Sequence, residues 1–184
     1  MAEKTPQLFS LLRADLLRQS LLQGHKVENL GFVRALKGCL QPRFHPFLLC
    51  RLSRASYLLG IPFLPFAFSY LNLVLFGLQI TPKCEIGGGL FLPHPVGTVL
   101  GAWRIGQNAT IFQQVTLGAK HLDMAFTPEL LPEIFDNVTI GAGAKVLGKV
   151  KLGDHVVVGA NSVVTQSFEA YSIVVGIPAR KVAS

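Results

Sequence analysis

The sequence predicts a mainly β protein: a parallel β-helix preceded by an α-helical N-terminal region. From position 134 to 164 every sixth residue is aliphatic, and a second set of small or medium residues repeats with the same period. The first set is Ile134, Ile140, Val146, Leu152, Val158 and Val164, and the second is Val138, Ala144, Val150, Val156 and Ser162. A period of six fits neither an amphipathic helix nor a plain strand. It is the period of short strands that coil and stack on one another.

Glycine follows directly after three of the aliphatic residues, at Gly141, Gly153 and Gly159. We interpret each six-residue unit as one short strand and one corner, with one aliphatic side chain pointing inward. Small residues allow the chain to turn at the corner. The repeat therefore predicts a solenoid of stacked coils.

The composition fits one folded domain with a helical extension. The chain has 184 residues, of which 50% are hydrophobic and 15% charged, with 18 glycines. This balance excludes a disordered chain and suits a solenoid with glycine corners. Cys39, Cys50 and Cys84 show neither metal-ligand spacing nor a paired framework, which indicates a reducing compartment and no metal. The N-terminus lacks the pattern of an export signal, so we expect a cytoplasmic protein.

Residues 1–78 form the predicted helical region. Apolar residues at helical spacing predict helices over 7–23, with Ser10 as a candidate cap, over 30–40, and from about Pro46 to Tyr57. Residues 1–56 carry nine Lys or Arg against three Asp or Glu, whereas the rest of the chain carries eight against seven. We expect these helices to pack on one another and on the mouth of the β-helix. No nucleic-acid-binding motif accompanies them, so we expect no nucleic acid partner.

No charged residue occurs between Arg54 and Lys83. This apolar run is long enough to be tested as a membrane span, but Pro62, Pro65 and two glycines interrupt it, and the first coil follows directly. Burial against neighbouring subunits and contact with a membrane surface through residues 1–80 both remain open. The basic segment before the run favours surface contact over a span, because anionic lipid attracts clustered cations. Such contact would place the protein at the inner face of the cell membrane.

Residues 79–184 form the predicted β-helix. The six-residue period starts at Ile80 and is disturbed around Thr98–Ala102. It stops again after Gly118 and restarts at Ile134. We expect this insertion, about 118–133, to leave the solenoid as a loop, and loops on rigid scaffolds often shape functional sites.

Four runs of residues resemble one known family. They are IGGGLFLPHPVG at 86–97, IGQNATIFQQVTLGA at 105–119, IGAGAKVLGKVKLGDHVVVGANSVV at 140–164 and VVGIPARKV at 174–182. Together they resemble serine O-acetyltransferases and, equally, the sugar O-acetyltransferases of colanic-acid and exopolysaccharide assembly. Both groups are left-handed parallel β-helix hexapeptide acyltransferases, and the likeness covers about residues 76–182. The resemblance implies a left-handed coil, a homotrimer, and acetyl-CoA bound in the groove between neighbouring β-helices.

The resemblance also implies a catalytic histidine. In this family one histidine follows the GGGLF run and acts as the general base, and His94 occupies that position. A neutral imidazole can take the proton of an acceptor hydroxyl at neutral pH and pass it to the departing thiolate. Gln79 stands where serine acetyltransferases place an aspartate that orients this base, and it could accept a hydrogen bond from the imidazole.

The donor side of the site matches the family. Gly118 and Ala119 match a Gly-Gly pair that brings backbone amides close to the thioester arm, and Ala142 and Ala160 match two small corner residues that line the pantetheine groove. Three cations are candidates for the nucleotide phosphates of CoA. They are Lys145, Arg180 and Lys181.

The acceptor side departs from serine acetyltransferases. Besides Gln79, that family places an aspartate where this chain has Pro93, and Arg-His-Pro where it has Leu130, Leu131 and Pro132. Neutral residues cannot replace the partners of a buried zwitterion without losing recognition. The pattern therefore favours the same donor with a different acceptor.

These observations predict an acetyl-CoA-dependent O-acetyltransferase that acts on a sugar hydroxyl in polysaccharide or glycan biosynthesis. A lipid-linked intermediate would suit an enzyme held at a membrane surface. Two alternatives remain: a serine O-acetyltransferase of cysteine biosynthesis, and a catalytically inactive trimer that serves as a scaffold.

The other histidines have weaker candidate roles. His155 lies beside an inward position and is expected to face solvent, whereas His121 lies in the inserted loop and could reach a neighbouring subunit's site. His25 and His45 belong to the helical region, where we expect structural roles.

Overall fold

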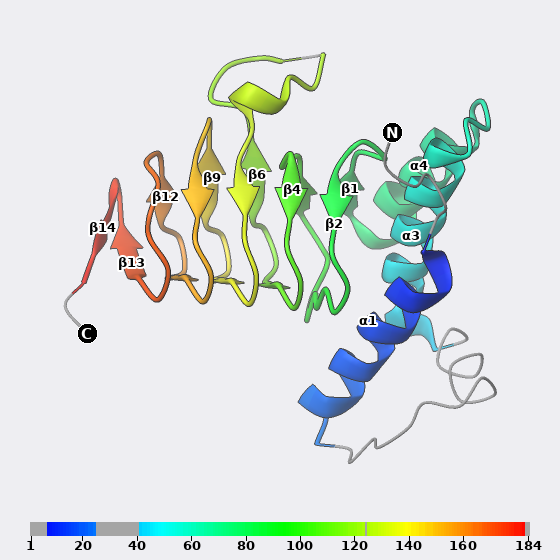
Figure 1. Ribbon diagram of the computed structural model, residues 1–184, viewed down its shortest axis with the longest axis horizontal. Helices are drawn as coiled ribbons and strands as arrows, with labels where there is room; N and C mark the ends of the chain where they lie inside the picture. The colour runs from blue at the N-terminus through cyan, green and yellow to red at the C-terminus, as the bar shows by residue number, and fades with distance from the viewer. Residues whose placement is uncertain (1–6, 25–40, 124, 183–184) are drawn as a thin grey trace.

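The computed structural model describes residues 7–24, 41–123 and 125–182 (Figure 1). The described helices gather beyond one end of a prism of stacked strands, and the C-terminus lies at the other end (Figure 1). The helices are α1 (Leu8–Leu22), α3 (His45–Leu58) and α4 (Leu64–Phe76), with short 3₁₀ segments η1 (Pro42–Phe44) and η2 (Pro128–Leu130).

Helices α1 and α3 confirm two of the predicted helices, and the one expected over 30–40 lies outside the described residues. Ser10 is not the cap that the sequence suggested. Helix α1 already begins at Leu8 after Gln7, and the Ser10 hydroxyl donates to the Gln7 carbonyl from within the first turn. Helix α4 lies inside the apolar run and has the second proline of that run, Pro65, in its first turn. It ends at Phe76, and Gly77 caps it in the left-handed conformation.

Three sheets form the sides of the prism, and we call them faces A, B and C. Face A contains β1 (Leu78–Ile80), β3 (Thr98–Leu100), β6 (Thr116–Gly118), β9 (Lys145–Leu147) and β12 (Val163–Val164). Face B contains β2 (Glu85–Ile86), β4 (Arg104–Ile105), β7 (Glu133–Ile134) and β10 (Lys151–Leu152). Face C contains β5 (Thr110–Ile111), β8 (Thr139–Ile140), β11 (Val157–Val158), β13 (Ile173–Gly176) and β14 (Ala179–Lys181).

Neighbouring strands within each face are parallel, and only the final pair, β13 and β14, is antiparallel. Successive strands of the chain visit the faces in the order A, B, C, so each circuit is one coil. The fold is a left-handed parallel β-helix after a helical region, as expected.

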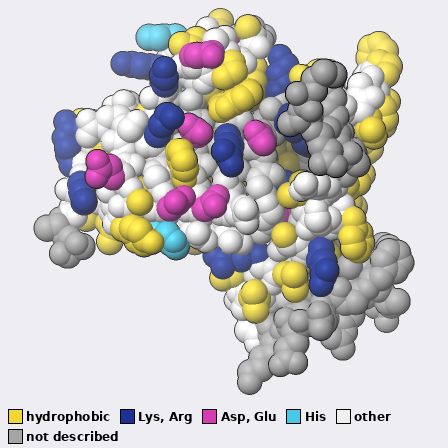
Figure 2. Space-filling view, in the orientation of Figure 1, with side chains coloured by type: hydrophobic (Ala, Val, Ile, Leu, Met, Phe, Trp, Pro, Cys, Tyr) yellow, Lys and Arg dark blue, Asp and Glu magenta, His cyan; other side chains and the backbone are white. Residues whose placement is uncertain are grey.

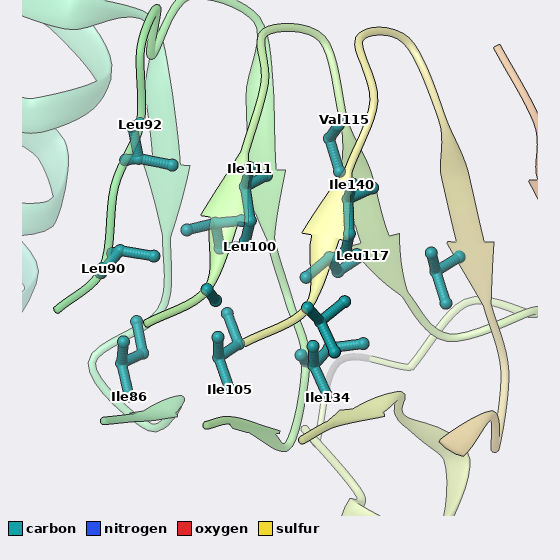
Figure 3. Packing of buried hydrophobic residues seen from close by; sticks show 14 of the residues in the cluster. Ile86, Leu90, Leu92, Leu100, Ile105, Ile111, Val115, Leu117, Ile134 and Ile140 are labelled. Atoms are coloured by element: carbon teal, nitrogen blue, oxygen red, sulfur yellow. The ribbon is translucent and has the colours of Figure 1, made fainter. Parts of the chain in front are cut away.

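The inward side chains confirm the six-residue repeat. On face B, Ile86, Ile105 and Ile134 pair in register and lie in one row inside the prism (Figure 3). The aliphatic and small sets that predicted the fold are all at most 1% exposed. Stacking therefore gives each coil a hydrophobic core that it could not form alone.

The glycines after the aliphatic residues have another role than the predicted one. Gly141 and Gly153 do not have positive φ; instead, a Cβ on either would lie within 2.6 Å of a backbone nitrogen in the next coil. They permit close approach between coils. The left-handed corner positions belong mainly to other residues: Asn108, Asn137, His155, Asn161 and Tyr171.

A buried ion pair fastens the helices to the first coil. Arg51 of α3 donates two 2.9 Å hydrogen bonds to Asp15 of α1, and both side chains are at most 3% exposed. Arg51 also donates to the carbonyls of Ile86 and Gly87, while Asp15 accepts from the amides of Gly89 and Leu90. Burial raises the pKa of the Asp15 carboxyl, and the Arg51 charge opposes that rise. The predicted packing of helices on the mouth of the β-helix is confirmed.

The insertion between β6 and β7 is a loop that stands off the prism (Figure 1). Asp123 accepts hydrogen bonds from the amides of Ala125 and Thr127 at 3.0 and 2.6 Å, and these bonds lower the pKa of its carboxyl. Lys83 donates to the Ala125 carbonyl at 3.2 Å. The loop is therefore held by its own turn and by the first coil.

Candidate active site

The candidate residues gather mainly along one edge of the prism, which we call the C–A edge. It consists of the turns that lead from a strand of face C to the next strand of face A: residues 92–97, 112–115, 141–144 and 159–162. Backbone hydrogen bonds of 2.8–3.2 Å stack these turns: Gln114 to Val96, Gly143 to Gln113, and Asn161 to Ala142.

His94 lies in the first turn of this edge, which is longer than the others. Leu92 and Leu100 both point into the core and are eight positions apart instead of six. This difference accounts for the disturbance of the repeat and lets His94 leave the prism, where it is exposed. The irregular coil is therefore the one that presents the imidazole.

His94 lines a pocket of about 410 Å³ between the β-helix and the helices. Its apolar wall includes Phe47, Phe76 and Phe91, and its polar lining includes Arg43 and Gln19. Among the described lining residues Arg43 carries the only full charge, and no carboxylate is present.

Gln19 is a site residue that the sequence analysis missed. It comes from α1, is 6% exposed and lines the His94 pocket, yet its Oε1 has no hydrogen-bond partner. An unpaired buried carbonyl oxygen is unfavourable unless a ligand or water satisfies it. The helical spacing of 7–23 predicted a packing helix, and no local signal distinguished this glutamine from the others.

Most of the predicted donor residues follow the C–A edge. Ala142 and Ala160 occupy its third and fourth turns, and Lys145 Nζ donates to the Gln114 carbonyl of the second turn at 2.6 Å. Arg180 pairs across β13–β14 with Val175, whose side chain lies against Gly159 of the fourth turn. We call the line of Ala142, Ala160, Lys145 and Arg180 along this edge the donor track. Four coil spacings of about 4.8 Å separate the His94 turn from the last coil, so the donor track is roughly 19 Å long.

Three predicted residues lie on face A instead. Gly118 and Ala119 stand at the far end of β6, with open space where a Gly118 side chain would be. Gln79 points outward from β1 beside Val99, and it shares no hydrogen bond with His94. Its role as orienting partner stays a prediction. Lys181 neighbours Arg180 on β14 and is exposed.

The remaining described histidines lie outside the pocket. His155 is exposed and stacks on Tyr171 with ring centroids 4.8 Å apart, which confirms that it faces solvent. His121 is exposed in the inserted loop, and His45 packs edge-on against Phe76. His25 lies outside the described residues.

Cys50 and Cys84 are buried free thiols, and Cys39 lies outside the described residues. Burial raises the pKa of the Cys50 thiol to about 11. In residues 7–24, 41–123 and 125–182, no group of three His, Cys, Asp or Glu side chains could hold a metal ion.

Comparison with known proteins finds similarity to one kind of transferase. Residues 132–166 match the family described as bacterial transferase hexapeptide (six repeats). A serine acetyltransferase of Staphylococcus aureus is 47% identical over 113 residues, which are 61% of this chain and 52% of that protein. The chain therefore spans about half the length of the curated relatives it matches.

Solved structures are similar over nearly the whole chain. Soybean serine acetyltransferase apoenzyme is 32% identical with a TM-score of 0.77, covering 96% of this chain and 69% of that one. A serine acetyltransferase in complex with CoA is 25% identical with a TM-score of 0.77, covering 96% and 70%. The similarity includes the helical region as well as the β-helix.

Proposed function

This chain belongs to the hexapeptide-repeat transferases, and we propose that it is an O-acetyltransferase that carries an acetyl group from acetyl-CoA to an acceptor hydroxyl. The observation that carries the proposal is the C–A edge, which joins an exposed histidine beside a pocket to a track of small residues and cations. A binding scaffold would not need this combination.

In the proposed reaction His94 accepts the proton of the acceptor hydroxyl as its oxygen attacks the thioester carbonyl. The tetrahedral intermediate collapses when the carbon–sulfur bond breaks, and the CoA thiolate takes the proton back from the imidazolium. The products are the acetyl ester and free CoA. The chain needs no metal for these steps.

CoA would lie along the C–A edge with its thioester near His94. Ala142 and Ala160 leave room for the extended pantetheine arm, because larger side chains would project from the turns into its path. Arg180 and Lys181 at the far end would meet the phosphates. Lys145 already donates to the Gln114 carbonyl, so its role toward a phosphate would require that bond to open.

Serine is the acceptor that the comparisons favour, because the relatives and solved structures named above are serine acetyltransferases. They do not support the sugar acceptor that the sequence analysis preferred. Arg43 at the pocket could pair with the carboxylate of serine, and Gln19 Oε1 could accept a hydrogen bond from its ammonium group.

A sugar hydroxyl remains the second candidate because of one observation. No carboxylate lines the described part of the His94 pocket, so the ammonium group of serine would find no negatively charged partner among these residues. Binding a neutral acceptor would not require an ammonium group to be buried without a negatively charged partner, which is energetically unfavourable.

A trimer would complete the site. Gln79, Gly118 and Ala119 lie on face A and away from the donor track of their own chain, so they would act on the track of a neighbouring subunit. In a cyclic trimer every subunit would then meet its neighbour in the same way.

The test has two steps. Acetyl-CoA that binds the native protein should raise its thermal unfolding midpoint by mass action. Release of free CoA thiol is then followed with L-serine and with a panel of neutral sugars. Turnover with serine supports the proposal, and turnover with sugars alone supports the second candidate. Absence of a midpoint shift at saturating acetyl-CoA would instead favour the inactive scaffold.

A further inference from the structure

Helix α4 and the turn before it expose apolar side chains in nearly every direction. Of the thirteen residues of α4, only Pro65 and Asn72 are buried. Ten large apolar side chains between positions 59 and 75 are 38–85% exposed: Leu59, Ile61, Phe63, Leu64, Phe66, Tyr70, Leu71, Leu73, Val74 and Leu75. Figure 2 shows hydrophobic side chains along the outer edge of the helical region, where Figure 1 places α4. Water-soluble monomers rarely leave so large an apolar surface unused.

The polar side of α4 faces the protein instead. Asn72 Nδ2 donates to the Pro46 carbonyl at 2.9 Å, and Ser69 shares a 2.9 Å hydrogen bond with Ser53 of α3. The Ser53 hydroxyl also contacts the Pro65 carbonyl at 2.8 Å. Positions 65, 69 and 72 share one side of a helix. An ordinary surface helix shows the reverse pattern, with its apolar side buried.

The charge of the described helical region is complementary to an anionic surface. Its one acidic residue, Asp15, is buried in the ion pair with Arg51. Arg13, Arg18, Arg43 and Arg54 have no carboxylate partner among the described residues. Two copies meeting through this surface would bring like charges together. Anionic lipid headgroups would bring opposite ones.

The dimensions fit a helix that lies in the surface of a bilayer. At thirteen residues α4 is about 20 Å long, which is shorter than the roughly 30 Å hydrocarbon core. No helix in the described part of the chain is long and apolar enough to cross a membrane. Phe63, Phe66 and Tyr70 are of the type that settles at the boundary between headgroups and acyl chains.

We infer that α4 and the preceding turn dock the enzyme on an anionic lipid bilayer. The helices stand beyond one end of the β-helix, so a bilayer at that end leaves most of the C–A edge open (Figure 1). If the proposed trimer forms, its rotational symmetry places three copies of α4 at the same end, and their binding energies combine. The inference does not depend on which acceptor the enzyme uses.

The experiment is co-sedimentation of the full chain with vesicles of phosphatidylglycerol and phosphatidylcholine, compared with vesicles of phosphatidylcholine alone. We expect binding to the anionic vesicles that weakens as salt is added. The triple variant F63S/F66S/V74S should bind them roughly tenfold or more weakly, because three exposed apolar anchors are lost.

A matched variant, L122S/Y171S, removes exposed apolar side chains far from α4 and should bind like the unmodified chain. Absence of vesicle binding, or equal binding by the triple variant, would overturn the inference. If the triple variant instead breaks up a higher oligomer that forms without lipid, the surface binds a second copy. The acetyl-CoA midpoint shift, measured on the same variants, separates these outcomes from failure of the proposed activity.

Discussion

His94 is the residue whose replacement tests the proposed chemistry most directly. We expect His94→Ala to lower the turnover rate by roughly 10²–10⁴-fold, because general-base catalysis contributes about that much. The acetyl-CoA midpoint shift should remain, since the imidazole lies at one end of the donor track. A variant that keeps its full turnover rate would exclude His94 as the base.

Gln19 tests whether the pocket between helix and β-helix holds the acceptor. We expect Gln19→Leu to raise the KM for the acceptor roughly tenfold, because it removes a hydrogen bond of about 1–1.5 kcal/mol. The KM for acetyl-CoA should stay unchanged, since Gln19 lies away from the turns at 141–144 and 159–162. Ser20→Ala is the control, because Ser20 lies on the same helix and does not line the pocket. Equal effects on both KM values would indicate a general loss of structure instead.

Among the secondary-structure elements, the buried pair of Asp15 and Arg51 joins two helices to the first coil. Arg51→Met should lower the free energy of unfolding by about 3–5 kcal/mol, since it leaves a buried carboxylate without its partner. Arg13→Met on the exposed side of α1 should change it by less than about 0.5 kcal/mol. Denaturant titration of both variants makes the comparison. Equal stabilities would show that the pair does not fasten the helices.

The order of the inserted loop should depend on pH through the ionisation of Asp123. Its folded-state pKa is lowered by hydrogen bonds from Thr127 and Ala125, so its contribution to loop order is present above the ordinary aspartate pKa and disappears as pH falls through the lowered value. We expect the protection factors of the Ala125 and Thr127 amides to be constant down to about pH 4 and to fall below it. Hydrogen exchange measures them. Asp123→Asn should remove this dependence, and an unchanged profile in that variant would assign it to another group.

The elements also show which features the sequence could predict. The six-residue period identified the inward residues of five coils, because each coil repeats the same burial requirement and so repeats the same residue type. The disturbance of the period was placed at Thr98–Ala102, whereas the two extra residues lie just before it, in the turn that carries His94. The pocket beside it could not be predicted, because Gln19 and Arg43 reach it from helices far away in the sequence. The pairing of Asp15 with Arg51, thirty-six positions apart, likewise leaves no local pattern.

At the scale of the whole molecule, faces B and C of the prism differ in the charge of their outward side chains. Outward side chains on face B alternate in sign, from Glu85 to Arg104, Glu133 and Lys151, and the last two form a 3.0 Å ion pair. A row of side chains with alternating charges is favourable on a face that is exposed to solvent. Strands β5, β8, β11 and β13 of face C present neutral β-branched side chains in register: Thr110, Thr139, Val157 and Ile173. The cations of this face, Arg180 and Lys181, lie on its last strand, β14. Face C is therefore the side that we expect to contact a neighbouring subunit.

Val157→Glu tests this expectation for the proposed trimer. A carboxylate at the centre of face C would lose its hydration on assembly and find no cation among its neighbours, so we expect subunit association to weaken at least roughly tenfold. Gln166→Glu adds the same charge at an exposed position after β12 and should leave the assembly intact. Analytical ultracentrifugation of both variants gives the subunit number.

Acetyl transfer by the same variants tests whether the site is shared between subunits. Because the site is proposed to include Gly118 and Ala119 of a neighbouring subunit, Val157→Glu should lose acetyl-transfer activity in proportion to its loss of trimer. A trimer that survives this substitution would place the contact on another face, and activity in a fully dissociated protein would show that one chain contains the whole site.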